Sequence, residues 1–230
     1  MFGRIARRYD MGNKVLSLGH DQAWRKRAVR LLDPRQGDLV LDIGTGTGDL
    51  SLELASRTRT VVAADFSLPM LTVGLAKVRS QRKSEKVLLA AADALSLPFA
   101  DNSFDGATTA FTLRNLARMS DGLREILRVL KPSAKLVCLE FMRPGSGLVD
   151  MFYRPYLNHV LPFLGARVTG DRTAYAYLAA SINAFSSPQE LADRMSEAGF
   201  AHVDCHLLNL GTVAIHVATK KATTPAGAVW

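Results

Sequence analysis

The chain has 230 residues, of which 48% are hydrophobic and 22% charged, and it carries a net charge of +8. This length and composition predict one globular α/β domain with some length left for an elaboration, and they exclude a disordered chain. The positive charge is typical of proteins that bind nucleic acid or visit an anionic membrane surface, and charge alone does not choose between these partners.

The first segment, residues 2–32, is basic and amphipathic. Its pattern predicts a helical N-terminal cap, which we place at residues 1–36, before the first strand. Residues 1–4 lead into charged positions instead of an apolar run, so we expect no secretory signal peptide. The cap either packs on the domain or also closes over a ligand and touches a membrane.

An apolar run at residues 40–43 ends in three glycines at alternate positions, Gly44, Gly46 and Gly48. This order predicts a buried strand, a tight turn and a helix start, whose free N–H groups attract a polar or anionic ligand. The third glycine comes one position too early for the G-x-G-x-x-G dinucleotide motif, and no G-K-[ST] phosphate loop is present. Acidic residues on both sides, Asp42 and Asp49, favour a cationic nucleoside, S-adenosylmethionine.

Two further apolar runs each end in an aspartate. The run at residues 60–65 ends in Asp65, about 20 residues after the glycine turn, where a carboxylate is placed to accept hydrogen bonds from ribose hydroxyls. The run at residues 87–92 predicts a third strand and is followed by Asp93. Asp93 is either an acceptor for the adenine amine or a residue that caps a turn.

The fourth predicted strand, residues 104–111, is followed by Arg114 and Asn115. The two polar residues stand between Leu113 and Leu116, which predicts a partly buried pair at the carboxyl end of the strand. Because ligands bind at this edge of an open α/β sheet, the pair favours a substrate role over a surface loop.

An insertion rich in aromatic residues, 147–182, follows a predicted helix at 122–131 and a fifth strand at 135–141. It interrupts the alternation of strands and helices, so it can line a pocket without serving the sheet. Charged residues and two prolines interrupt its most lipophilic part, which excludes a membrane-spanning helix. We therefore predict that the insertion lines the substrate pocket.

A capping box at Ser187 opens the last helix, and two strands, residues 203–208 and 212–219, then form a hairpin. Five strands that alternate with helices and a terminal hairpin predict a Rossmann-like α/β fold. We expect the seven-stranded, mostly parallel sheet of class I methyltransferases, with an antiparallel last strand. The single domain spans residues 1–221, and we expect a disordered tail at residues 222–230.

The two cysteines, Cys138 and Cys205, both lie in apolar, strand-like runs. This placement predicts reduced residues in the core of a cytosolic protein. Neither cysteine is spaced for a metal site, and we expect no metal cofactor.

Several stretches of the chain form a recognisable set. They are residues 2–10, Leu41-Asp42 to Gly48-Asp49, Asp65-Phe66-Ser67, Asp93-Ala94, Leu113-Arg114-Asn115, residues 128–132, Leu139-Glu140-Phe141 and Tyr175-Ala176-Tyr177-Leu178. With this set, nearly the whole chain resembles the ubiquinone/menaquinone biosynthesis C-methyltransferase family (UbiE/MenG-like). The glycine turn alone marks only the methyltransferase superfamily, whereas the Leu-Arg-Asn and Tyr-x-Tyr-Leu runs are more specific.

The resemblance implies an enzyme that uses S-adenosylmethionine, bound by Thr47, Asp65 and the Asp93-Ala94 pair. The full set of expected cofactor-binding residues is Asp42, Gly44, Thr45, Gly46, Thr47, Asp49, Asp65, Phe66, Asp93, Ala94 and Ala110. The chain departs from the family pattern at Ala110, where Ser is common, which predicts one cofactor hydrogen bond fewer. It also has Thr112 where Gly is expected, which predicts a narrower substrate site.

The resemblance also implies C-methylation of a polyprenylated hydroquinone, either a demethylmenaquinol or a ubiquinol precursor. The reduced ring must be the nucleophile, and a base or an anion stabiliser beside its hydroxyl should help. We expect Arg114 to stabilise the phenolate and Asn115 to orient the hydroxyl. The other candidate catalytic residues are Tyr9 and His20, and the expected substrate-binding residues are His159, Tyr175 and Tyr177.

Three alternatives stay open at this point. A nucleic-acid methyltransferase would suit the charge, but residues 110–115 lack the Asn/Asp-Pro-Pro-aromatic run expected of one that acts on amino groups. A non-catalytic quinone carrier would bind the lipid without consuming a cofactor, and an enzyme of the same fold would act on another small phenolic substrate. We expect a cytoplasmic protein in peripheral contact with the inner face of an anionic membrane, with no nucleic-acid partner and a homodimer as a candidate assembly.

Overall fold

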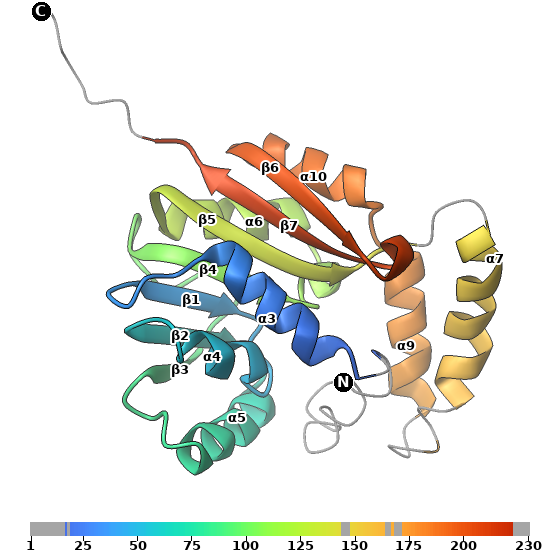
Figure 1. The fold of residues 1–230 in the computed structure, drawn as a ribbon, viewed down its shortest axis with the longest axis horizontal. Helices are drawn as coiled ribbons and strands as arrows, with labels where there is room; N and C mark the ends of the chain where they lie inside the picture. Colours follow the sequence, from blue (N-terminus) through green and yellow to red (C-terminus); the bar gives the residue numbers. More distant parts are fainter. Residues whose placement is uncertain (1–16, 18, 144–147, 164–166, 168–171, 223–230) are drawn as a thin grey trace, which may run out of the picture.

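The computed structural model describes residues 17, 19–143, 148–163, 167 and 172–222, and in this part of the chain a sheet of seven strands organises the fold (Figure 1). The strands are β1 (Leu39–Ile43), β2 (Thr60–Asp65), β3 (Val87–Ala91), β4 (Phe104–Ala110), β5 (Leu130–Phe141), β6 (Phe200–Leu208) and β7 (Val213–Lys220). Their order is β3-β2-β1-β4-β5-β7-β6, and β7 is antiparallel to both β5 and β6 while the other pairs are parallel. The predicted sheet with its antiparallel last strand is confirmed.

Helices cover both faces of the sheet. The described helices are α3 (Asp21–Leu32), α4 (Asp49–Leu54), α5 (Leu68–Ser80), η2 (Leu113–Asn115), α6 (Met119–Val129), α7 (Leu148–Pro155), η3 (Tyr156–Val160), α9 (Arg172–Asn183), α10 (Pro188–Glu197) and η4 (Asn209–Gly211). Figure 1 shows α3 lying across one face of the sheet, with α6 and α10 on the opposite face. The capping box at Ser187 forms as predicted, because its side chain accepts from the Glu190 N–H while the Glu190 side chain accepts from the Ser187 N–H.

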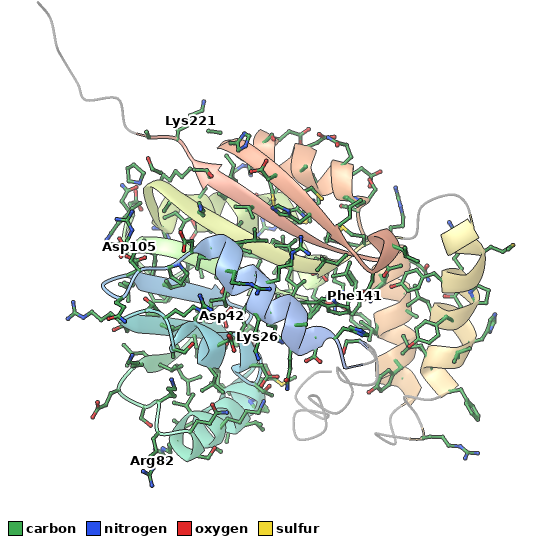
Figure 2. All side chains as sticks on the ribbon, in the orientation of Figure 1. Lys26, Asp42, Arg82, Asp105, Phe141 and Lys221 are labelled. Atoms are coloured by element: carbon green, nitrogen blue, oxygen red, sulfur yellow. The ribbon has the colours of Figure 1, made fainter. Side chains whose placement is uncertain are left out.

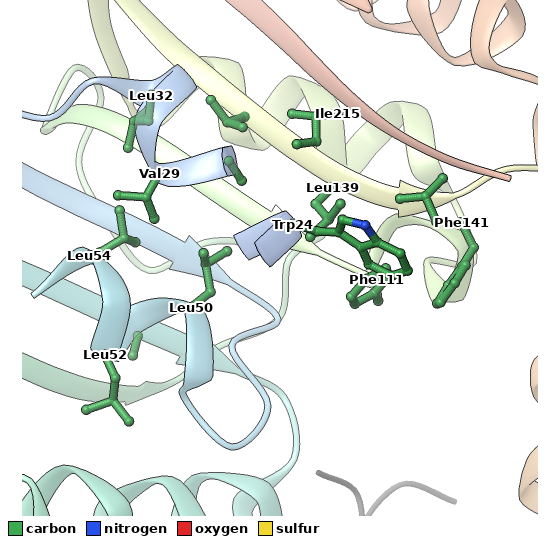
Figure 3. Packing of buried hydrophobic residues seen from close by; sticks show 14 of the residues in the cluster. Trp24, Val29, Leu32, Leu50, Leu52, Leu54, Phe111, Leu139, Phe141 and Ile215 are labelled. Carbon is green, nitrogen blue, oxygen red and sulfur yellow. The ribbon is translucent and has the colours of Figure 1, made fainter. Parts of the chain in front are cut away.

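Each face of the sheet buries its own apolar core. On the face that carries α3, Trp24 and Val29 of α3 pack with Leu50 and Leu54 of α4 and with Leu139 of β5 (Figure 3). On the other face, α6 and α10 pack against β4 and β5. The amphipathic pattern that predicted the cap is explained for α3, whose apolar side is buried in the first core.

The start of β5 differs from the prediction. We expected a helix up to Lys131 and a strand from Lys135, but α6 ends at Val129 and β5 begins at once. Phe104 pairs with Leu130 and Gly106 pairs with Lys135, so residues 131–134 form a bulge opposite one residue of β4. The bulge follows from Pro132, which lacks the N–H that a regular ladder needs.

The described residues of the insertion after β5 are helical. Figure 1 shows α7 and α9 side by side, beyond the carboxyl ends of β1, β4 and β5. Pro155 lies inside this helical stretch and is followed directly by the π-helical turn η3, because proline removes one hydrogen bond of the α-helical ladder. The insertion therefore stands at the sheet edge where ligands bind in open α/β folds.

The prediction that both cysteines are core residues is wrong for Cys205. Cys138 is buried in the middle of β5, but Cys205 is exposed on β6. Strand β6 is the last strand of the sheet and pairs only with β7, so an apolar stretch there does not guarantee burial. Residues 223–230, which make up nearly all of the predicted tail, lie outside the described part of the chain.

Candidate functional site

The glycine turn after β1 is braced by a buried carboxylate. Asp42 is 1% exposed, and its side chain accepts hydrogen bonds from the hydroxyls of Thr45 (2.7 Å), Ser51 (2.6 Å) and Thr108 (2.8 Å). Burial raises the pKa of the Asp42 carboxyl, and the three hydroxyl donors oppose this effect. Asp42 thus ties the turn to α4 and β4, and Figure 2 shows it near the centre of the fold.

The turn also needs space that only glycine leaves. Gly44 has a positive φ of 65°, and a Cβ on it would lie 2.2 Å from the Oγ1 of Thr112. Thr112 donates its hydroxyl to the carbonyl oxygens of Gly44 (3.2 Å) and Ala110 (3.1 Å). The loop after β4 is therefore seated directly on the glycine turn, and Thr112 fills the place where the family pattern has a smaller residue.

A second carboxylate stands at the end of β2. Asp65 accepts from the Gly46 N–H and from the Ser67 N–H, both at 2.7 Å. Burial raises the pKa of the Asp65 carboxyl, while these two backbone donors oppose this. The side chain is fixed between the glycine turn and the start of α5, at the position predicted for a ribose acceptor.

A cavity of about 500 Å³ lies at the carboxyl ends of β1, β2 and β4. Among the predicted site residues, those that line it are Gly44, Gly46, Asp65, Phe66, Asp93, Ala94, Asn115 and Tyr177. The cavity walls also include Ser67, Met70, Leu97, Phe111 and Thr112, which sequence reasoning did not assign to the cofactor. In the sequence these residues are marked only by lying a few positions after a predicted strand, and many residues that bind nothing share that feature.

The remaining predicted cofactor-binding residues line a second, smaller space instead of the cavity. Asp42, Thr45, Thr47, Asp49 and Ala110 line a smaller cleft of about 20 Å³, together with Arg25 of α3. Gly44 and Gly46 line both spaces, so the turn forms a wall shared by the cavity and the cleft. In the cleft, Asp49 accepts a salt bridge from Lys77 of α5 at 2.5 Å.

Arg114 and Asn115 are adjacent in the sequence but lie in different surroundings. Asn115 lines the cavity, donates its amide to the Phe111 carbonyl oxygen (3.2 Å) and accepts from the Tyr177 hydroxyl (3.2 Å). The Arg114 side chain is 3% exposed and forms a buried ion pair with Glu140, the penultimate residue of β5. The predicted pair is thus divided between the cavity and the protein interior.

An aromatic cluster holds the Arg114 guanidinium. Its central carbon lies 5.8 Å from the ring centre of Phe111 and 5.7 Å from that of Phe141. The two rings stack at 4.7 Å, and Trp24 meets both of them edge-on (Figure 3). Such contacts between a cation and aromatic faces are favourable and orient the guanidinium.

Of the other predicted catalytic and substrate residues, none that the structure describes lines the cavity. Tyr9 lies outside the described residues. His20 is exposed at the start of α3, where its Nδ1 lies 3.0 Å from the Ser17 carbonyl oxygen and its ring stacks on Trp24. His159 is exposed on η3, and Tyr175 of α9 is buried in the core.

Comparison with known proteins identifies the family. Residues 1–220 match the model of the ubiE/COQ5 methyltransferase family. The chain belongs to this family. It is 45% identical over 222 residues to the demethylmenaquinone methyltransferase of Thermus thermophilus, covering 96% of this chain and 100% of the relative. It is 44% identical to the enzyme of the same name from Mycolicibacterium gilvum, covering 96% of this chain and 93% of the relative.

Solved structures agree on the fold. A SAM-dependent methyltransferase from Thermotoga maritima superposes with a TM-score of 0.65 at 20% identity, covering 96% of this chain and 98% of the other. One from Aquifex aeolicus gives a TM-score of 0.59 at 20% identity, covering 85% of this chain and 88% of the other.

As a member of the ubiE/COQ5 family, the protein is a methyltransferase that uses S-adenosylmethionine. The predicted family, fold, enzyme class and cofactor are thereby confirmed, and the alternative of a non-catalytic carrier is set aside. The site suits the cofactor, because a fixed carboxylate and a glycine wall stand at a cavity of suitable size. Within the described residues, no group of three or more His, Cys, Asp or Glu side chains is arranged to hold a metal ion, and no helix is long and apolar enough to cross a membrane.

Proposed function

We propose that the protein methylates a ring carbon of a reduced, polyprenylated quinone precursor, a demethylmenaquinol. The observation that carries this proposal is the identity of 45% to a demethylmenaquinone methyltransferase over the full length of that relative. The aromatic insertion at α7, η3 and α9 supports it, since it stands at the ligand-binding edge of the sheet and is built to contact a lipophilic ring.

The cofactor residues divide between the two spaces. Bound S-adenosylmethionine supplies an electrophilic methyl group on a positively charged sulfur. We propose that Asp65 accepts the ribose hydroxyls, that Asp93 and Ala94 contact the adenine, and that Phe66 covers it in the cavity. The other expected cofactor residues, Asp42, Thr45, Thr47, Asp49 and Ala110, surround the amino-acid end in the cleft.

The acceptor ring approaches from the insertion. Asn115 and Tyr177 both line the cavity and are hydrogen-bonded to each other. Because each side chain carries polar atoms at the cavity wall, either one can orient a ring hydroxyl. We assign Arg114 to stabilising negative charge on the ring oxygen. The substrate contacts expected of Tyr175 and His159 stay predictions from the sequence, because neither residue lines the cavity. A dry pocket that aligns the ring carbon with the donor methyl would supply much of the acceleration.

The prenyl chain implies contact with a membrane, and the outer side of the insertion supports this part of the proposal. Met151, Val160 and Phe163 are 58%, 44% and 60% exposed, large values for apolar side chains. Arg167 lies beside Phe163, with its guanidinium carbon 5.3 Å from the centre of that ring. Exposed apolar side chains next to cations suit peripheral contact with the anionic inner face of a cytoplasmic membrane.

Cosedimentation with anionic liposomes tests this contact. Phe163→Glu should weaken binding, and Leu88→Glu, at a 52% exposed side chain of β3 on the far edge of the sheet, should leave it unchanged (Figure 1). Equal binding by both variants would refute the assignment of this surface. The absence of a nucleic-acid partner and the homodimer stay predictions from the sequence.

Turnover with defined lipids tests the function itself. The protein should consume S-adenosylmethionine when given a chemically reduced demethylmenaquinone, and it should consume none with the oxidised quinone, because only the reduced ring is electron-rich. A methylated product from a small phenol without a prenyl chain, at equal or higher kcat/KM, would instead favour a divergent substrate.

A further inference from the structure

The proposed reaction needs a proton acceptor for the ring hydroxyl, and the residues considered so far do not supply one. Arginine keeps its charge in proteins and has no lone pair to accept a proton, so Arg114 cannot be the base. His20 and His159 are exposed to solvent, whereas the proposed reaction needs a dry site. Tyr177 donates its hydroxyl to Asn115 and is a phenol itself.

Glu140 is the carboxylate in direct contact with Arg114. It is 0% exposed, and its Oε1 accepts from both Arg114 Nη1 and the Phe141 N–H. Its second oxygen, Oε2, is buried and has no hydrogen-bond partner among the described residues, and the same holds for Arg114 Nε. Within this buried ion pair, Glu140 Oε2 can therefore accept one further hydrogen bond and Arg114 Nε can donate one.

The Arg114 side of the pair lies between a residue of the cavity wall and the insertion. Phe111 lines the cavity, and its ring carries the Arg114 guanidinium. From α7 and η3, Tyr153 and Tyr156 pack against the same apolar cluster as Phe111, and the Tyr156 hydroxyl is also buried without a partner in the described part of the chain. A ring that enters beneath the insertion would meet three buried polar groups with hydrogen-bonding capacity to spare.

A purely structural role explains these facts less well. A buried ion pair seldom stabilises a fold more than an apolar pair of similar size, and it does so only when all its hydrogen bonds are made. The Arg114–Glu140 pair leaves one atom of each partner unmatched among the described residues. Its chemistry is better suited to a ligand than to stability.

The charges around Glu140 fit a base. Arg114 from η2 and Cys138 on β5 itself interact with Glu140, and Tyr153 of the insertion, which neighbours Tyr156, interacts with Arg114. Arg25 of α3 lies at the Phe111 ring. Burial raises the pKa of the Glu140 carboxyl, and Arg114 opposes this effect. A carboxylate whose pKa is raised above its ordinary value is a stronger base than an exposed one.

We propose that Glu140 is the general base of this methyl transfer, taking the proton of the ring hydroxyl on Oε2, directly or through one water. This proposal rests on the proposed function. The O–H bond breaks, its electron pair moves into the ring, the ring carbon bonds to the methyl group, and the bond from sulfur to methyl breaks with both electrons staying on sulfur. The ring C–H proton then leaves to solvent, and Glu140 returns its proton to the ring oxygen.

The variant Glu140→Gln tests the base with nearly unchanged shape. We expect kcat to fall by about 100-fold or more, with the affinity for S-adenosylmethionine nearly unchanged. The decline of the wild-type rate at low pH should disappear, and the rate should follow the acidity of the substrate hydroxyl instead. Glu197→Gln, which alters an exposed carboxylate at the end of α10, serves as the matched control and should keep the wild-type rate.

A series of substrates separates the base from a structural part. Reduced quinones with increasingly acidic hydroxyls need less help from a base, so the rate lost on Glu140→Gln should shrink along the series. If Glu140→Gln does not fold, Glu140→Asp, which keeps the charge one methylene further back, should show the same dependence in weaker form. A constant loss along the series, or wild-type turnover by Glu140→Gln, would overturn the proposal, whereas absence of turnover by the wild type would overturn the proposed function instead.

Discussion

The side chain of Thr112 occupies the space directly above the α-carbon of Gly44. A Cβ on Gly44 would lie 2.2 Å from Thr112 Oγ1 and 2.3 Å from its Cγ2, far inside van der Waals contact. The two residues are 68 positions apart and are also joined by a hydrogen bond from the Thr112 hydroxyl to the Gly44 carbonyl oxygen. The loop after β4 and the glycine turn therefore form one continuous wall of the cavity.

The first prediction concerns this contact. Gly44→Ala should lower the free energy of unfolding by about 2–4 kcal/mol, because it adds overpacking to the strain of a positive φ. The double variant Gly44→Ala with Thr112→Gly should recover the overpacking part and keep the strain. Denaturant unfolding of the variants measures both effects, and equal stability of the single and double variants would show that the clash is relieved in another way.

The second prediction concerns Asp65. Asp65→Ala should weaken the binding of S-adenosylmethionine by about 10-fold to 100-fold, since hydrogen bonds to a charged group contribute about 1.5–3 kcal/mol. Calorimetry measures the affinity, and thermal unfolding shows whether the variant is folded. Asp101→Ala is the control, because that side chain is 68% exposed and paired with Arg128. Unchanged affinity in Asp65→Ala would remove the ribose assignment.

The third prediction concerns pH and His216, which is 0% exposed on β7 and donates from Nε2 to the Pro188 carbonyl oxygen at 2.9 Å. Burial lowers its pKa below the value in the unfolded chain. Above the unfolded pKa, His216 is neutral in both states; as the pH falls below it, only the unfolded chain takes up the proton, and the free energy of unfolding decreases by at most about 1.4 kcal/mol for each unit of pH.

Unfolding of His216→Gln checks this sign. Between about pH 7 and about pH 5 it should lose less stability than the wild type. His202→Gln, at a side chain that is 71% exposed, should lose as much as the wild type. If both variants behave alike, the acid sensitivity has another origin.

The fourth prediction concerns Lys220, which closes the end of α6. Its ammonium donates to the carbonyl oxygens of Leu127 (2.8 Å) and Leu130 (2.7 Å) and to Asn102 Oδ1 (2.8 Å). Lys220→Met should therefore lower the free energy of unfolding by about 1–3 kcal/mol, because these acceptors lose a charged donor. The neighbouring exposed Lys221→Met is the control, and an equal loss of stability in both would mean that the carbonyl contacts contribute nothing specific.

The parts of the site that the sequence predicts are those encoded locally. The glycine turn, Asp65 and the capping box at Ser187 each follow from residues within a few positions of one another, and the structure places them as expected. Apolar runs likewise predict the strands, because a short continuous or alternating run of apolar residues is typical of a strand buried on both faces or on one face.

Other parts depend on contacts between distant segments. Arg114 and Glu140 are 26 positions apart, and neither carries a local pattern that names the other as its partner. The sequence of the glycine turn does not show whether the Asp49 carboxylate faces the cavity or the smaller cleft. The structure places it in the cleft, where it pairs with Lys77. Cys205 looks like a core residue until the strand order puts β6 at the edge of the sheet.

The position of the transferred methyl group tests the central claim most directly. The protein is incubated with S-adenosylmethionine that carries a deuterated methyl group and with reduced demethylmenaquinone, and the product is examined by mass spectrometry and NMR. We predict that the intact label appears on the ring carbon next to a hydroxyl-bearing carbon, and only with the reduced lipid. A label on oxygen, or none on the lipid while the protein binds the cofactor, would contradict the account.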